Sequence, residues 1–201
     1  MTSVVNKVNN CAAIILAAGK SNRLGRPKQL LKYQNKNLLQ YTIDTARQSA
    51  VQSVIVVLGS NADLILNEIN YSGIRVVIND DWETGMASTI RCGIQSLQKL
   101  DPEVNTAILM VCDQPYVTND LLNSLIETQK ETGKPIIASE YEGAIGTPVL
   151  FQKQFFSELM KLKGDAGAKK IMMQYSDLLA MAPFPKGSID IDTIDDYEAL
   201  I

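Results

Sequence analysis

The sequence contains no histidine, and this absence removes several kinds of chemistry. It excludes catalytic triads that use an imidazole group, metal sites that use histidine ligands, and acid–base catalysis by histidine. Any chemistry in this chain must therefore use carboxylates, cationic side chains, backbone amides or a metal ion held by oxygen atoms.

Cysteine is scarce. The three cysteines, Cys11, Cys92 and Cys112, lie far apart, and no two of them form a Cys-x-x-Cys pair. Their odd number and wide spacing exclude a fully paired disulfide framework and a cysteine zinc site. Cys11 and Cys112 fall within apolar runs, so we expect both to be buried as small hydrophobic residues.

Long hydrophobic runs are also missing. The apolar runs are far shorter than the roughly 20 residues that a membrane-spanning helix needs. Residues 1–10 are polar and lack the charged-then-apolar order of a signal peptide, so we expect a short disordered lead. A formal net charge of -3 argues against the basic surface that nucleic acids require. We therefore expect a cytoplasmic protein that binds neither membranes nor nucleic acid.

The pattern that is present predicts an α/β protein. The chain has 201 residues, 46% of them hydrophobic, which is enough for residues 11–201 to form one domain around one core. Short apolar runs alternate with longer amphipathic ones, which predicts a three-layer α/β/α fold with a mostly parallel, Rossmann-like sheet. The expected strands are 12–16, 53–58, 75–78, 106–111, 135–139, 148–151 and 179–183. The expected helices are 38–49, 62–70, 86–98, 119–132, 153–161, 166–174 and 194–200.

Capping residues mark some helix ends. Thr118 and Asp165 are the expected N-caps of the helices 119–132 and 166–174. Gly133, two residues before a proline, is expected to end the former. In sheets of this kind, ligands gather at the carboxyl ends of the strands. The segments that follow residues 16, 58, 78 and 111 are therefore the places to look for a site.

The segment after the first expected strand, residues 16–28, combines small residues with positive charge. Ala17, Ala18 and Gly19 let the backbone amides approach an anion closely. Four cationic side chains follow within nine residues: Lys20, Arg23, Arg26 and Lys28. A nucleoside triphosphate is the ligand that this combination favours, and a solvated basic turn is the alternative. A Walker phosphate loop is excluded, because Ile14 stands where that motif needs a glycine.

Aspartates mark two further segments. The apolar run 106–111 ends in Cys112-Asp113-Gln114-Pro115, which predicts a carboxylate at the edge where the first strand also ends. Such a carboxylate suits Mg²⁺, a hard ion that prefers carboxylate, water and phosphate oxygens. Near the C-terminus, Asp192 is either a second metal ligand or the cap of the last helix. Asp195 and Asp196 are expected in the first turn of that helix, where negative charge is favourable.

Four segments in this order resemble the molybdopterin nucleotidyltransferases. They are Leu-Ala-Ala-Gly-x-Ser-x-Arg-x-Gly-x-x-Lys at 16–28, the stretch from Asn79 to Gly93, Asp-Gln-Pro at 113–115 and Asp-Ile-Asp-Thr at 190–193. The resemblance extends over residues 11–198 and implies the nucleotide-diphospho-sugar transferase type of fold. Leu-Ala-Ala-Gly resembles the CTP-using branch, the molybdenum cofactor cytidylyltransferases, since the GTP-using branch usually has glycine where Ala18 stands. Thr147 departs from the pattern, because relatives often have histidine there.

The resemblance implies a Mg²⁺-dependent transfer of CMP from CTP to molybdopterin with release of pyrophosphate. The attacking phosphate is already anionic near neutral pH, so the reaction needs no general base, which agrees with the missing histidine. The implied catalytic residues are Arg23, Lys28 and Asp113, and the implied metal ligands are Asp113 and Asp192. The implied nucleotide-binding residues are Leu16, Ala17, Ala18, Gly19, Ser21, Arg23, Lys28, Asn79, Gly85, Met86, Ser88 and Asp113. The implied acceptor-binding residues are Thr147, Pro148, Gly164, Asp165 and Gly167.

Three alternatives remain open at this point. The first is a cytidylyl- or other nucleotidyltransferase for another phosphate acceptor, which the stretch from Trp82 to Gly93 disfavours. The second is a GTP-using molybdopterin guanylyltransferase. The third is a carrier that delivers molybdenum cofactor to a xanthine-dehydrogenase-like enzyme, which would also be the partner of the cytidylyltransferase.

Overall fold

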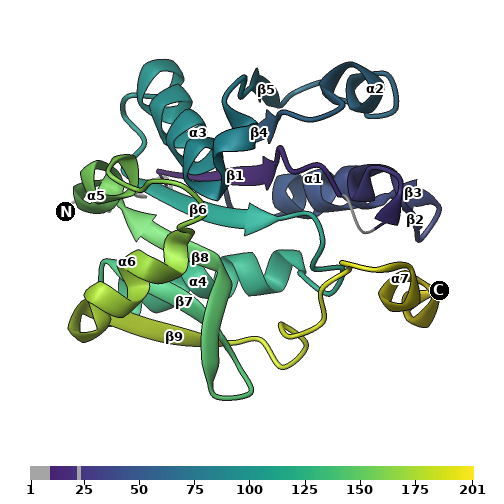
Figure 1. Cartoon of the computed structure of the whole chain (residues 1–201). Coiled ribbons are helices and arrows are strands. Elements are labelled where there is room, and N and C mark those ends of the chain that lie inside the picture. The colour runs from purple at the N-terminus through teal and green to yellow at the C-terminus, as the bar shows by residue number, and fades with distance from the viewer. Residues whose placement is uncertain (1–9, 22–23) are drawn as a thin grey trace, which may run out of the picture.

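A seven-stranded sheet forms the centre of the protein (Figure 1), whose computed structural model describes residues 10–21 and 24–201. The strand order is β5-β4-β1-β6-β8-β7-β9. The strands are β1 Cys11–Ala17, β4 Ser53–Leu58, β5 Arg75–Ile78, β6 Thr106–Val111, β7 Ile136–Tyr141, β8 Ala144–Gln152 and β9 Leu179–Pro183. The expected N-terminal lead, apart from Asn10, lies outside the described residues.

The sheet is mostly parallel, as predicted. Strand β1 pairs in parallel with β4 and β6, and β4 pairs in parallel with β5. Strand β8 runs antiparallel to both β6 and β7, whereas β9 is parallel to β7. The β7–β8 connection is a tight hairpin, because Glu142 and Gly143 both adopt positive φ, at 53° and 75°. The antiparallel direction of β8 thus follows from a two-residue turn.

Helices cover both faces of the sheet, which gives the predicted three layers. Helices α1 and α4 cover one face and α3, α5 and α6 the other (Figure 1), so along β1 Ala13 and Ile15 belong to the core cluster of the first face and Ile14 and Leu16 to that of the second. The helices are α1 Leu38–Gln48, α2 Ala62–Leu66, α3 Met86–Leu100, α4 Asn119–Thr132, α5 Phe156–Met160, α6 Ala168–Gln174 and α7 Ile194–Leu200. None of the helices in the described part of the chain has the length and apolar character needed to cross a membrane.

Short elements complete the chain. A two-stranded sheet is formed by β2 Lys32–Tyr33 and β3 Lys36–Asn37, which the sequence analysis did not predict. The C-terminal helix α7 packs beside it, and the Tyr197 hydroxyl donates to the Lys32 carbonyl over 2.9 Å. The 3-10 helices are η2 Lys28–Leu30, η3 Trp82–Thr84, η4 Lys153–Phe155 and η5 Ser176–Leu178.

Several predicted boundaries shift. The predicted strand 135–139 extends to Tyr141, and the predicted strand 148–151 begins already at Ala144 and ends at Gln152, because the two strands meet in the β7–β8 hairpin. The predicted helix 62–70 ends at Leu66, since side chains from outside the helix take the next backbone groups. The Glu68 carbonyl accepts from Asn37, and the Asn70 amide donates to Gln40. The predicted helix 153–161 begins as η4 and becomes α-helical only for Phe156–Met160.

The capping predictions give a mixed outcome. Thr118 caps α4 by accepting from the Leu121 amide, and Gly133 ends that helix with a φ of 66°. The prediction for Asp165 was wrong: α6 begins after Gly167, and an Asp165 oxygen lies instead against Gly85. The last helix is capped by Thr193 rather than Asp192.

The remaining local predictions are confirmed. Asp195 and Asp196 lie in the first turn of α7, where Asp196 completes a capping box with Thr193. Cys11 and Cys112 are buried, and burial raises the pKa of each thiol to about 12. Both cysteines therefore act as core residues rather than as reactive thiols.

Candidate functional site

The carboxyl ends of the parallel strands meet at one edge of the sheet. The register aligns Leu16 with Val57 on one side and with Val111 on the other. The segments that follow β1, β4 and β6 therefore leave the sheet at the same level, and β5 ends one strand further out. This edge is where the sequence analysis predicted a site.

Hydrogen bonds hold the loop after β1 against the sheet. The Ala18 carbonyl accepts from the Ser60 amide over 3.0 Å, which ties this loop to the segment after β4. The buried Gln29 side chain donates to the carbonyls of Ala17 (2.8 Å) and Gly19 (3.1 Å). Gln29 could not be assigned a role from the sequence, because a glutamine beside charged residues carries no distinctive signal.

Two further predicted residues of this loop have different outcomes. The Ser21 hydroxyl accepts from the Lys28 amide over 2.9 Å, so it closes the loop at the start of η2. Arg23, predicted to be catalytic and nucleotide-binding, lies outside the described residues.

Lys28 joins the predicted metal ligands. Its Nζ atom donates to Asp113 Oδ2 over 2.6 Å and to Asp192 Oδ1 over 2.8 Å. Burial of the Lys28 ammonium lowers its pKa, but the two carboxylates outweigh this effect and hold the pKa above its ordinary value. Three residues from distant parts of the sequence thus form one charged cluster at the carboxyl edge.

A third carboxylate belongs to the same cluster. Asp190 is exposed at the surface, but partial desolvation of its carboxyl group together with the charges of Asp113 and Asp192 raises its pKa to about 6. Asp190 had no predicted role of its own. The signal was present, because residues two apart in an extended segment point the same way, and Asp190 stands two before Asp192.

Backbone and side-chain contacts hold this C-terminal segment in place. The Ile191 amide donates to the Asp113 carbonyl over 2.9 Å, and the Ile191 side chain is fully buried. The buried Gln114 side chain donates to the Gly187 carbonyl and accepts from the Thr147 hydroxyl, each over 3.0 Å. Thr147, a predicted acceptor residue, therefore reaches the residue next to Asp113.

The predicted nucleotide residues after β5 form a compact network. Asn79 is buried, and its side-chain amide donates to the hydroxyls of Ser88 (2.8 Å) and Thr89 (3.2 Å). The Ser88 hydroxyl in turn donates to the Gly85 carbonyl over 2.8 Å. Asn79 therefore fixes the start of α3 relative to the end of β5.

Three of the predicted acceptor residues, Gly164, Asp165 and Gly167, lie beside the start of α3, where the predicted nucleotide residues Gly85 and Met86 are found. Gly85 has a φ of 105°, and a Cβ atom there would lie 2.5 Å from Gly164 and Asp165. The Ala87 amide donates to the Gly164 carbonyl over 3.0 Å, so this helix terminus has one donor fewer for a phosphate. Gly167 faces Met86, an exposed residue. The predicted acceptor residues thus fall into two groups: Thr147 and Pro148 on β8, and Gly164, Asp165 and Gly167 beside α3.

Trp82 packs against the exits of β1 and β4. A Cβ atom at Gly59 would lie 2.6 Å from the Cβ atom of Trp82 and 2.9 Å from that of Ala18. Only glycine fits at position 59 without displacing one of these neighbours. The methyl group of Ala18 is therefore held at a defined position on the same edge of the sheet.

The cluster suits a divalent cation. The positions of Asp113 Oδ2 and Asp192 Oδ1 show that both oxygens converge on one positive charge, here that of Lys28. Within 10–21 and 24–201, no three acidic or cysteine side chains are arranged to hold a metal ion by themselves. Mg²⁺ is commonly bound by one or two carboxylates together with substrate phosphates, so two carboxylates fit that ion.

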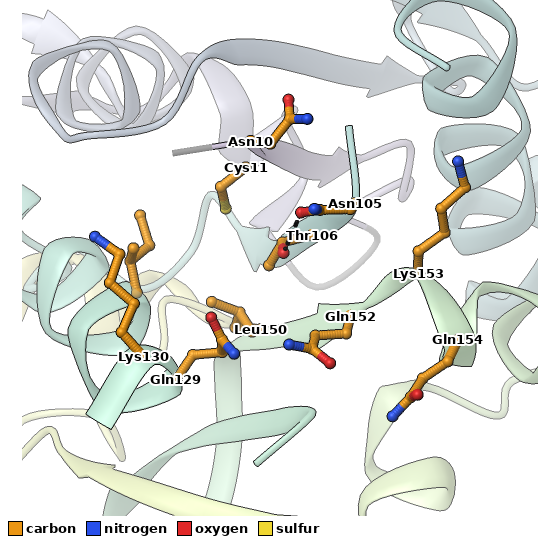
Figure 2. A pocket seen from close by; sticks show the side chains of 11 residues that line it. Asn10, Cys11, Asn105, Thr106, Gln129, Lys130, Leu150, Gln152, Lys153 and Gln154 are labelled. Atoms are coloured by element: carbon orange, nitrogen blue, oxygen red, sulfur yellow. Dashed lines mark hydrogen bonds between the residues drawn. The ribbon is translucent and has the colours of Figure 1, made fainter. Parts of the chain in front are cut away.

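A cavity of about 710 Å³ lies at the opposite edge of the sheet (Figure 2). Its lining includes Cys11 and Thr106, which begin β1 and β6, and Gln152, which ends the antiparallel β8. Most of its polar groups are neutral amides, and the Lys153 ammonium is bound to the Pro102 carbonyl over 2.8 Å. The predicted site residues lie at the other edge, so this cavity is separate from the candidate site.

Known proteins share this architecture over nearly the whole chain. The crystal structure of Rv0371c from Mycobacterium tuberculosis H37Rv is 33% identical, with a TM-score of 0.83 over 94% of this chain and 96% of that one. The same protein was also solved in complex with manganese, at 30% identity over 94% and 97% of the two chains and a TM-score of 0.79.

Two curated relatives differ in what they are said to do. The nicotine blue oxidoreductase of Paenarthrobacter nicotinovorans is 26% identical over 94% of this chain and 95% of its own length. The molybdenum cofactor cytidylyltransferase of Escherichia coli K12 is 22% identical over 92% of both.

The family model described as the MobA-like NTP transferase domain matches residues 13–178. That match includes the loop after β1, the start of α3 and Asp113, and the chain therefore belongs to this family of nucleotidyltransferases.

Proposed function

We propose that this nucleotidyltransferase transfers CMP from CTP to the terminal phosphate of molybdopterin carrying molybdenum, and releases pyrophosphate. The observation that carries the proposal is the position of Lys28, whose ammonium lies 2.6 Å from Asp113. A cationic loop at the exit of β1 thus faces an acidic cluster at the exit of β6, as a metal-bound triphosphate requires.

The proposed roles follow from this arrangement. Asp113 and Asp192 hold Mg²⁺, which when bound neutralises negative charge on the phosphate oxygens. Lys28 and Arg23 bind the triphosphate and the departing pyrophosphate. The attacking phosphate is already an anion, so the protein has to align it with the α-phosphorus and offset charge rather than remove a proton.

The remaining residues bind the nucleotide. The amide groups of Ala17, Ala18 and Gly19, next to Leu16, hold the base and phosphates. Across the site, the buried contacts of Asn79 and Ser88 keep Gly85 and Met86 in place at the start of α3.

The choice of CTP rests on the wall formed by Ala18, Gly59 and Trp82. Because a Cβ atom at Gly59 would already collide with both neighbours, this wall has no spare room, and the Ala18 methyl cannot retreat from a bulky purine. The cytidylyltransferase among the relatives supports the same choice.

The choice of molybdopterin as acceptor rests on the family relationship, because Thr147 departs from the histidine that relatives often have at this position. The Thr147 hydroxyl donates to Gln114, the residue after Asp113, and this contact is the reason for assigning Thr147 to the acceptor side of the site. The product would pass to a xanthine-dehydrogenase-like enzyme.

A pyrophosphate-release assay tests the proposal directly. CTP and GTP are each offered with molybdenum-loaded molybdopterin, with methylerythritol phosphate and with a sugar phosphate, in the presence of Mg²⁺. We expect release only with CTP and molybdopterin, and none after chelation of the metal ion by EDTA. Release with another acceptor would replace the molybdopterin assignment, and no release with any pair would favour a carrier of molybdenum cofactor.

A further inference from the structure

The ammonium group of Lys28 lies where the proposed metal ion would bind. It contacts one oxygen of Asp113 and one of Asp192, at 2.6 and 2.8 Å, and the Lys28 side chain is only 17% exposed. A Mg²⁺ ion bound to the same two oxygens would lie about 2.0–2.1 Å from each. The two cations would then be within a few ångströms of one another and would repel strongly.

The backbone around Lys28 leaves the ammonium able to move. The Lys28 amide is fixed to the Ser21 hydroxyl, and the neighbouring Gln29 is fixed to the carbonyls of Ala17 and Gly19. The start of the side chain is therefore anchored to the loop that would hold the phosphates, while its flexible four-carbon stem allows the charged end to turn. A triphosphate in this loop would offer the ammonium an anion in place of the two carboxylates.

We propose that Lys28 and the divalent ion compete for Asp113 and Asp192, so that the metal ion binds tightly only when a nucleoside triphosphate gives the Lys28 ammonium another anion. This proposal rests on the proposed function, because it uses the same metal and nucleotide sites. Binding linkage is reciprocal, so the metal ion in turn strengthens nucleotide binding. In the absence of nucleotide, Lys28 satisfies the two carboxylates and keeps the pair from binding divalent ions.

Titration with Mn²⁺, followed by the electron paramagnetic resonance of the free ion, tests this competition. The proteins are the wild type, Lys28→Met, Lys28→Gln and Lys36→Met, each with and without a non-hydrolysable CTP analogue. Without the analogue, we expect both Lys28 variants to bind Mn²⁺ about tenfold more tightly than the wild type, within the usual range of coupling between sites. After the Mn²⁺ bound by the analogue alone has been subtracted with a protein-free titration, the analogue should tighten Mn²⁺ binding at least about tenfold in the wild type and less in the Lys28 variants.

The Lys36→Met variant is the matched control, because Lys36 pairs with a single carboxylate, that of Asp44, and is 48% exposed. It should match the wild type in every titration. Thermal melting shows that each variant is folded, and Lys28→Gln decides the question if Lys28→Met is not.

The remaining outcomes separate this proposal from the proposed function. If folded Lys28 variants bind Mn²⁺ no more tightly than the wild type, the competition is overturned. The metal site of the proposed function still stands in that case, provided that Asp113→Asn removes the nucleotide-dependent Mn²⁺ binding of the wild type. If the wild type binds no Mn²⁺ with or without the analogue, the metal assignment and the competition both fail.

Discussion

The two halves of the sheet contribute to the candidate site in different ways. In the parallel half, β5-β4-β1-β6, every strand runs the same way, so the segment after each one emerges at the same edge. In the other half, β8-β7-β9, the strands run in mixed directions. Residues from that half reach the site only through particular contacts, such as those of Gln114 with Thr147 and Gly187. Strand order therefore brings the segments with the proposed nucleotide residues to one edge, whereas the proposed acceptor residues and the second metal residue reach that edge only through tertiary packing.

The largest expected effect comes from Asp113, where the two halves meet. Asp113→Ala should lower Mg²⁺-dependent turnover by at least about a thousandfold, the upper range for loss of a preorganised electrostatic group. The fold should be retained, because Lys28 keeps Asp192 as a partner. Steady-state kinetics with circular dichroism measures both effects, and near-normal turnover in this variant would refute the metal assignment.

A smaller loss is expected for Lys28→Ala, in the parallel half. It removes one cation from the proposed triphosphate site and should lower kcat by about a hundredfold, which corresponds to about 2.7 kcal/mol of transition-state stabilisation. Single-turnover kinetics at saturating CTP separates this loss from weaker nucleotide binding. An unchanged rate would mean that the ammonium only holds the two carboxylates.

Gly59→Ala examines the packing of the parallel half without removing a charge. The added Cβ atom would meet Trp82 at 2.6 Å, so we expect a loss of stability of about 1–3 kcal/mol, as for other overpacked sites. Chemical denaturation measures this change. Gly19→Ala is the control, since no atom lies within 4 Å of a Cβ at position 19 and stability should be unaffected. Equal stability of both variants would contradict the described packing of Trp82.

The smallest effect is expected in the mixed half. Thr147→Val removes the hydroxyl that donates to Gln114 and should raise KM for the acceptor several-fold, as expected for one hydrogen bond of about 0.5–1.5 kcal/mol. KM for CTP should be unchanged, and Thr147→Ser should restore the wild-type value. A parallel rise in KM for CTP would show that the two halves do not divide donor and acceptor as proposed.

Much of the fold could be predicted because its elements have strong local signals. The bounds of β4, β5, β6, β9, α4 and α7 agree with the prediction residue for residue, and each of these elements is a distinct apolar run or a well-capped periodic segment. The hairpin of β2 and β3 was missed because two-residue strands are too short to show alternation. Helix α2 ends early because Asn37 and Gln40, remote in sequence, take its backbone groups.

The candidate site also has a part that local sequence signals predict and a part that only tertiary contacts determine. The sequence by itself determined which strands end in small, cationic and acidic residues, since these follow apolar runs directly and parallel strands expose such ends together. Only the tertiary structure decided that Lys28 lies between Asp113 and Asp192, that Asp190 shares their field, and that Gln29 and Gln114 brace the two sides. The physical reason is that these contacts join segments up to 164 residues apart, where no local periodicity or spacing carries information.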